Sequence, residues 1–436
     1  MSNTASSLGA LAGGKTRTVD WQSPAMAARR KARYAADRRL QAYGMLAIFF
    51  ALGFLLILVS TLTFTGYRAF VQTMATVEID LAGADIDPEN LMAANWRGVV
   101  RDSLRNQVAE LPRSNEREFF NILTSSAHFI VRDQVIKNPE LLGKASLFSI
   151  PLSDPLDQLA KGQINPDLPE NQRRVSDVQI KYYNQLEAAG ALSQPFNWGL
   201  FFNSDSRFPE LAGLAGAISG SFWVLLVCFL ISFPIGIAAA IYLEEFAPKN
   251  RFTDVIEVNI NNLAAVPSVV FGLLGLAVFL GWFGLPRSAP LVGGMVLALM
   301  TLPTLIIVTR ASLKSVPSSI KEAALGIGAS KHETILHHIL PLSMPTIMTG
   351  TIIGLAQALG ETAPLLLIGM NAFITSPPDG VLEASTALPT QIYIWADSPE
   401  RGFVARTSAA ILVLLGFLVL MNSIAIFLRQ RFERRW

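Results

Sequence analysis

Residues 319–341 read SIKEAALGIGASKHETILHHILP, a polar stretch within the apolar second half of the chain. Ser319 and Ser330 each stand three residues before a glutamate. In this Ser-x-x-Glu pattern the hydroxyl and the carboxylate each accept a hydrogen bond from a backbone N–H that the first helical turn leaves unpaired. The stretch therefore predicts two short, capped helices that meet at Gly328 and connect two membrane spans.

The composition of the chain is typical of a membrane protein. Of its 436 residues, 51% are hydrophobic and 16% are charged, and the mean hydropathy is +0.41, which excludes an ordinary soluble domain. The single cysteine, Cys228, lies in an apolar run and is expected to be a small core side chain. His337 and His338 are adjacent and would point about 100° apart on a helix, so together with His332 they do not suggest a metal site. We expect neither a metal nor a cofactor.

Several apolar runs have the length of about 20 residues that a helix needs to cross the hydrocarbon core. There are six of them, at about 44–66, 214–242, 259–282, 289–308, 346–370 and 409–428. The third is the least regular, because Asn259, Asn261 and Asn262 crowd its start and Pro267 interrupts it. The first is expected to be an uncleaved anchor, because it is longer than the apolar region of a signal peptide and follows about forty mostly polar residues. The sequence thus predicts an all-α polytopic membrane protein with six transmembrane helices.

The distribution of charge gives the orientation of these spans. Residues 1–43 contain eight Lys or Arg against two Asp, so the positive-inside rule makes them a basic cytoplasmic tail. Five further crossings place the polar stretch 319–341 and the C-terminal residues 431–436 on the same side. Both termini are thus expected to be cytoplasmic, and the long polar segment 67–210 is expected to be extracytoplasmic.

The segment 67–210 is too long and too regularly patterned to be a linker. Residues 76–81 alternate as a strand does, whereas residues 90–108, 114–135 and 177–189 carry apolar residues at helical spacing. We expect a small α+β domain here. Its 14 Lys or Arg and 19 Asp or Glu give a net charge of −5, which favours contact with another protein or a structural role over the binding of an oxyanion.

One stretch near the N-terminus has the spelling of a phosphate-binding loop. Residues 9–16 read GALAGGKT, which fits the GxxxxGK[ST] pattern. Such a loop needs a buried strand before it and a helix after it, but only the polar residues 1–8 precede this one. No acidic residue at the end of an apolar strand follows it. We therefore expect no ATP hydrolysis by this chain.

An ionisable residue, Glu361, lies inside the fifth apolar run. Such a group is costly in a membrane and usually has a function. Gln357 stands four residues earlier and would share a helical face with it, while Pro364 removes the hydrogen bond to the Gly360 carbonyl and predicts a kink. Two interpretations stay open: a role in the substrate pathway or its gating, and a carboxylate that is hydrogen-bonded across a helix interface.

The order of residues in the polar stretch resembles the cytoplasmic coupling loop of ABC-importer permeases. That loop is written Glu-Ala-Ala, three residues, Gly, nine residues, Ile, one residue, Leu-Pro, and this chain departs from it only at His338, which stands at the Ile position. The resemblance implies a docking surface for an ATPase formed by Glu322, Ala323, Ala324 and Gly328. For Glu322 the alternative is a purely structural role as a helix cap.

Three further motifs carry a closer resemblance. YLEEFA at 242–247, GETAPLL at 360–366 and PTQIY at 389–393 look like those of the PstA-type permease of phosphate ABC importers. The resemblance covers about residues 213–430. It implies the type I ABC importer permease fold for residues 211–430, with the α+β domain as an addition to that fold.

The same resemblance implies partners and a pathway. The partners would be a homologous permease of the PstC type, a dimer of PstB-type ATPases and a periplasmic phosphate-binding protein of the PstS type, in the lipid of a bacterial inner membrane and without nucleic acid. Gln357, Glu361 and Thr362 are the candidates for the translocation pathway. Relatives often carry arginine where Gln357 stands, so Glu361 would either pair with a cation of the partner permease or gate the path.

These expectations describe the permease subunit of an ATP-driven phosphate importer, which is not itself an enzyme. Two alternatives remain at this point. One is a permease for another oxyanion or small solute. The other is a regulatory membrane scaffold of phosphate sensing, with residues 67–210 as its interaction surface.

Overall fold

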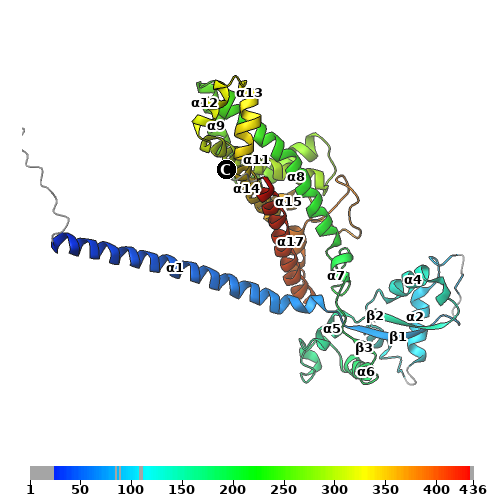
Figure 1. Cartoon of the computed structure of the whole chain (residues 1–436). Coiled ribbons are helices and arrows are strands. Elements are labelled where there is room, and N and C mark those ends of the chain that lie inside the picture. Colours follow the sequence, from blue (N-terminus) through cyan, green and yellow to red (C-terminus); the bar gives the residue numbers. More distant parts are fainter. Residues whose placement is uncertain (1–23, 84–85, 88–89, 108–110, 433–436) are drawn as a thin grey trace, which may run out of the picture. The chain divides into compact units, whose positions relative to one another are not determined.

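A computed structural model describes residues 24–83, 86–87, 90–107 and 111–432 of the chain (Figure 1). Residues 1–61 form one compact unit and residues 62–436 form a second. The GALAGGKT spelling at residues 9–16 lies outside the described residues. The two units are taken in turn below.

The described part of the first unit belongs to a single helix, α1 (Pro24–Gly66). The helix begins at Pro24 and runs through the basic segment, before the apolar run that starts at Gly44. Residues 24–43 are rich in Ala, Arg and Lys, which are strong helix formers, and proline is favoured at the first helical position. The apolar run 44–66 forms the second half of the same helix.

The second unit begins with a small domain built on a three-stranded antiparallel sheet. The strand order is β2 (Ala145–Pro151), β1 (Met74–Asp80), β3 (Leu192–Ser193). Along β1 every second side chain is buried, as in a sheet with one face in a core. The register pairs Val77 with Phe148 and Ala75 with Ile150, so the buried faces of the two strands coincide.

Helices cover this sheet and complete the core of the domain. They are α2 (Trp96–Asn106), α3 (Glu116–Phe120), α4 (Ala127–Lys137), α5 (Asp154–Ala160) and α6 (Asp177–Ala188). Leu104 of α2 and Val131 of α4 join Val77 and Phe148 of the strands in one buried cluster, and Figure 1 shows both helices beside the sheet. The prediction of a small α+β domain is confirmed.

The remainder of the second unit is helical. Four long helices form its main bundle: α8 (Ala215–Ile241), α11 (Pro290–Ser315), α14 (Leu340–Gly360) and α17 (Gly402–Phe432). Glycines let these helices approach closely, as is common in membrane bundles. A Cβ on Gly294 of α11 would lie 2.5 Å from Cβ of Val227 on α8, so only hydrogen fits there. Short helices complete this part: α7 (Gly199–Phe202), α12 (Ser318–Gly326), α13 (Lys331–Thr334), α15 (Ala363–Leu367) and α16 (Leu388–Ala396).

The third predicted span is not one straight helix. Helix α9 (Arg251–Ala264) and the helical segment 268–282, which begins as α10 (Ser268–Leu274), meet at an angle of 104°. The bend follows from Pro267, which lacks a backbone N–H and disfavours a helical residue before it. Among the described residues five helices can each cross a membrane by length and composition, and the count reaches six if the bent pair is one span.

A buried polar cluster joins the small domain to the bundle, and we call it the junction cluster: Asp154, Asp157, Lys161, Glu210 and Arg406. Arg406 of α17 is 6% exposed and donates a hydrogen bond to the carbonyl oxygen of Ala212. Lys161 pairs with Asp157 at 2.5 Å. Burial raises the pKa of Asp154 and of Glu210, and it lowers the pKa of Lys161.

The start of α17 lies against this cluster. A Cβ on Gly402 would overlap the carboxylate of Asp154, so this position of the helix accepts only glycine without a shift. Gln158 donates a hydrogen bond of 2.8 Å to the same carboxylate. Because these contacts lie between segments far apart in the sequence, they fix the small domain on the first turn of α17.

Candidate functional site: the coupling helices and the broken fifth span

The polar stretch folds as two short helices with a glycine turn between them, as predicted. Helix α12 ends at Gly326 and helix α13 begins at Lys331. Gly328 has a φ of +95°, a backbone conformation that glycine adopts without strain, which explains the residue type at the turn. From α13 the chain continues through a wider π-type turn, Ile335–Ile339, into α14.

The second predicted cap is confirmed. Ser330 Oγ accepts a hydrogen bond of 3.2 Å from the backbone N–H of Glu333, and the backbone N–H of Ser330 donates to the Glu333 carboxylate at 2.8 Å. These two bonds satisfy N–H groups that the first turn of α13 leaves free.

The first predicted cap is wrong. Helix α12 begins at Ser318, directly after Pro317, and its start has no side-chain cap, so Ser319 lies inside the first turn. Proline at position 317 moves the start of the helix by two residues, so that Pro317 and not Ser319 is the N-cap, and the Ser-x-x-Glu spacing then no longer bridges the cap position. Glu322 is exposed, and within the described residues its carboxylate has no hydrogen bond. Its role as a cap is therefore excluded, and its charge faces solvent.

The exposed face of α12 is partly apolar. Ala324 is 5% exposed and packs inward, whereas Ala323 lies on the surface. Leu325 is 43% exposed, and Ile327, at the end of the helix, is 84% exposed. A large aliphatic side chain so exposed beside a free carboxylate is typical of a surface that contacts another protein. The sequence pattern did not single out Ile327, because an isolated isoleucine in a short helix carries no periodic signal.

Six charged side chains hold this region to the bundle, and we call them the ion-pair network: Glu244, Glu245, Glu257, Arg310, Lys314 and Lys321. Lys321 of α12 pairs with Glu245, which follows α8. Arg310 of α11 bonds the carboxylate of Glu257 on α9 at 2.6 Å and approaches Glu244 at 3.4 Å. The network thus ties α12 to the segment that follows α8, and Arg310 ties that segment to α11 and α9.

Only part of this network could have been found in the sequence. Glu244 and Glu245 belong to the YLEEFA motif, but their partners Arg310 and Lys321 lie 66 and 76 residues away. Pairing over such separations depends on how the helices pack. The three asparagines that crowd the start of the third run are exposed on α9, where Asn259 bonds the Val255 carbonyl of its own helix at 2.8 Å.

The fifth predicted span breaks at Glu361. Helix α14 ends at Gly360, Glu361 has extended backbone angles of −78° and 115°, and α15 begins two residues later. Pro364 is the cause, since its ring would clash with the carbonyl of Gly360 in a continuous helix. Glu361 still closes α14, because its N–H bonds the Ala358 carbonyl at 3.2 Å, and the chain leaves the helical path after it. The shared face of Gln357 and Glu361 stays a prediction.

The break places its polar side chains at different depths. Gln357 is exposed, whereas Glu361 and Thr362 are half-buried. Throughout the described residues the Glu361 carboxylate has no hydrogen bond or ion pair. After the break the chain packs tightly again, because a Cβ on Gly272 of α10 would lie 2.6 Å from the Cα of Pro364.

Comparison with known proteins separates the chain into two parts. The family described as binding-protein-dependent transport system inner membrane component matches residues 232–436, and a domain of unknown function, DUF3333, matches residues 27–170. The first match contains the coupling helices and the broken span. The second contains most of the small domain.

Relatives of known name resemble the second half of the chain. Phosphate transport system permease protein PstA 2 of Mycobacterium bovis is 31% identical over 246 residues, which cover 55% of this chain and 79% of that protein. Phosphate transport system permease protein PstA of Yersinia pestis is 32% identical over 220 residues, 49% of this chain and 71% of that protein. A solved structure of the inward-facing MetNI methionine ABC transporter is 16% identical with a TM-score of 0.40, over 51% of this chain and 98% of that one.

Proposed function

Because the chain belongs to the family of ABC-importer permeases that includes the PstA proteins, we propose that it is the transmembrane permease subunit of an ATP-driven importer of inorganic phosphate. Permeases of this family are not enzymes. The observation that carries the proposal is the pair of coupling helices, which stands in the matched part of the chain and presents a free carboxylate and an exposed isoleucine.

We infer the orientation and partners as follows. The basic N-terminal segment and the coupling helices lie in the cytoplasm, and the small domain lies outside. A separate ATPase dimer of the PstB type binds and hydrolyses ATP, a second permease of the PstC type completes the pathway, and a PstS-type protein delivers phosphate from the periplasm. The chain is a multi-pass protein of the bacterial inner membrane.

The coupling helices are proposed to transmit the motion of the ATPase. Glu322, Ala323, Ala324 and Gly328 shape the docking surface, to which we add Ile327 because of its exposure. Motion of α12 reaches the bundle through the Lys321–Glu245 ion pair and through Arg310. Lys321 and Glu257 are each 35% exposed, so one side of each pair is solvated and can exchange partners at a lower cost in free energy than a fully buried pair.

The substrate pathway is proposed to pass the break in the fifth span, beside Gln357, Glu361 and Thr362. The break exposes backbone groups that a continuous helix would pair internally, and irregular backbone at membrane depth is tolerated where it lines a cavity. Glu361 alone would repel phosphate. Its proposed roles are to pair with a cation of the partner permease or to gate the path, while Gln357 offers a neutral donor.

The test is phosphate uptake into proteoliposomes that contain the complete complex. We expect uptake that requires ATP, and we expect the Glu361→Gln complex to assemble normally and to lose roughly tenfold in uptake rate. Unchanged uptake by this variant would exclude the role of Glu361. Competition by sulfate or other oxyanions in the same assay separates phosphate transport from transport of another oxyanion.

A regulatory scaffold is the second candidate function. It would rest on the small domain, which lies outside the residues 232–436 that match the transport family. Normal ATP-driven uptake by a complex that lacks residues 67–210, together with a changed phosphate response of the cell, would assign regulation to this domain. Loss of uptake would assign it to transport.

A further inference from the structure

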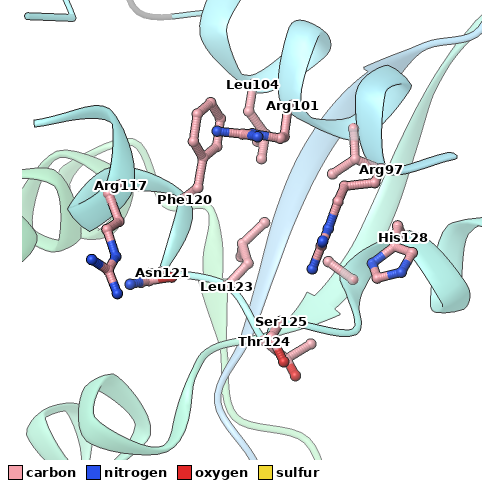
Figure 2. A pocket seen from close by; sticks show the side chains of 12 residues that line it. Arg97, Arg101, Leu104, Arg117, Phe120, Asn121, Leu123, Thr124, Ser125 and His128 are labelled. Carbon is pink, nitrogen blue, oxygen red and sulfur yellow. The ribbon is translucent and has the colours of Figure 1, made fainter. Parts of the chain in front are cut away.

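The small domain contains a cavity that neither the coupling helices nor the broken span uses. Its volume is about 210 Å³, and it lies between α2, α3 and the start of α4 (Figure 2). This is smaller than a site for a drug-sized molecule, which measures about 300–1,000 Å³. The cavity therefore suits a small ligand.

The cavity is lined by basic side chains and by no acidic one. Arg97 and Arg101 come from α2, Arg117 comes from α3, and His128 comes from α4. None of the twelve lining residues is an aspartate or glutamate. In the described part of the chain none of the three arginines forms an ion pair within 4.0 Å, although ion pairs are present elsewhere in the same domain.

The carboxylates beside Arg117 in the sequence have other partners. Glu116 pairs with Arg105 at 2.9 Å, and Glu118 accepts a hydrogen bond of 2.7 Å from Ser176. Arg117 therefore lies between two glutamates without being neutralised by them. The arrangement leaves its guanidinium available to a ligand.

Two further features prepare the cavity for a negative charge. The guanidinium of Arg101 lies 4.6 Å from the centre of the Phe120 ring, which holds it in place, and Figure 2 shows this stack beside the cavity. Helix α4 begins at the cavity wall, and the side chain of Ser126 does not cap it. Three of its first four N–H groups bond backbone carbonyls of residues 124 and 126, so the helix start adds the partial positive charge of its dipole but few free donors.

The histidine at this wall keeps a neutral side chain at pH 7. Burial and the nearby Arg97 lower the pKa of His128 below its ordinary value. A neutral imidazole can donate one hydrogen bond and accept another, so it adds a polar contact without adding charge. The positive charge of the cavity therefore comes from the three arginines.

We propose that this cavity binds a small oxyanion of the phosphate and sulfate class. Arginine forks match the geometry of such anions, and three of them line this one cavity. The domain as a whole carries a net charge of −5, so the basic cavity is a local feature and not part of a basic surface. The expectation that this domain disfavours oxyanions rested on its average charge, and this cavity is a local exception to that average.

The proposal is tested on the purified full-length protein in detergent by titration calorimetry at constant ionic strength. Inorganic phosphate and sulfate are the two probes. We expect at least one of them to bind, and we expect the double variant Arg97→Gln, Arg101→Gln to lose roughly tenfold or more in affinity. Arg174→Gln changes an exposed arginine that does not line the cavity and should leave the affinity unchanged.

Two results would overturn the proposal. One is the absence of binding of either probe to the unmodified protein, and the other is equal binding by the double variant and by Arg174→Gln. A second variant, Arg117→Gln, removes one of the three charges without changing α2. A loss of affinity in this variant as well could not be due to misfolding of α2. This test is independent of the proposed transport function, because it measures anion binding and not transport.

Discussion

The junction cluster and the ion-pair network lie at opposite ends of α8 and differ in their environment. Glu210 precedes this helix and Glu244 follows it, and 27 helical residues rise about 40 Å. In the junction cluster Asp154, Glu210 and Arg406 are all buried, whereas the pairs of the network are partly solvated. Buried charges that lose a partner are costly, and solvated pairs exchange easily. The comparison suggests a rigid joint at the small domain and a movable one at the coupling helices.

The largest effect is expected from Arg406→Met. It removes the cation beside two buried carboxylates and the hydrogen bond to Ala212, and such a change costs about 3–5 kcal/mol. The loss of stability can be measured by thermal unfolding in detergent and by the rate of proteolysis of the small domain. Arg401→Gln, an exposed arginine five residues earlier, is the matched control and should leave both unchanged.

A smaller loss is expected from Gly402→Ala. The added methyl group overlaps the Asp154 carboxylate, and overpacking of this kind costs about 1–3 kcal/mol. The same substitution at Gly416, where a Cβ meets nothing within 4 Å, should raise the free energy of unfolding by up to about 1 kcal/mol. Equal effects at the two glycines would contradict the close packing at the joint.

At the coupling helices the effect should be larger in transport than in stability. Lys321→Gln removes the cation beside Glu245, whose side chain is only 7% exposed, but the amide can still donate to the carboxylate, so the free energy of unfolding should fall by about 1 kcal/mol. Coupling changes of about 0.5–2 kcal/mol would lower ATP-driven uptake by roughly 2- to 30-fold. The reversed pair Lys321→Glu with Glu245→Lys should restore part of the uptake. If the network mattered only for folding, Lys321→Gln would lower the free energy of unfolding and leave ATP-driven uptake unchanged.

The smallest effect is a pH dependence at the joint. Burial raises the folded-state pKa values of Asp154 and Glu210 above their unfolded values of 3.8 and 4.5. At pH values between the unfolded and the folded pKa of each group, the folded protein therefore binds more protons than the unfolded protein. Lowering the pH from neutrality towards this window should therefore stabilise the joint. Asp154→Asn should reduce the slope of the unfolding free energy with pH, and an unchanged slope would exclude Asp154 as its source.

Local patterns predicted local structure well in this chain. The glycine turn at position 328 and the Ser330 cap depend only on neighbouring residues, and both are confirmed. The Ser319 cap failed because Pro317 sets a different helix start. The irregular third run does bend at Pro267, and the kink predicted at Pro364 is a complete break of the helix.

Contacts between residues far apart in the chain could not be predicted from the sequence. The partners of Arg310 and the burial of Arg406 follow from helix packing, and no spacing rule brings residues 53 to 194 positions apart together. The basic cavity could not be predicted from the sequence for a related reason. Its arginines come from two helices in a domain of negative net charge, and only the fold brings them to one space.

The central claim is that an ATPase drives this chain through the exposed face of α12. The most direct measurement is ATP-dependent phosphate uptake by the reconstituted complex with Glu322→Gln and Ile327→Asp combined, together with co-purification of the ATPase subunit. Since Glu322 caps no helix, its substitution tests docking and not folding. We predict that the variant permease folds, loses its ATPase subunit and loses ATP-driven uptake. Full uptake with the ATPase still bound would contradict the account.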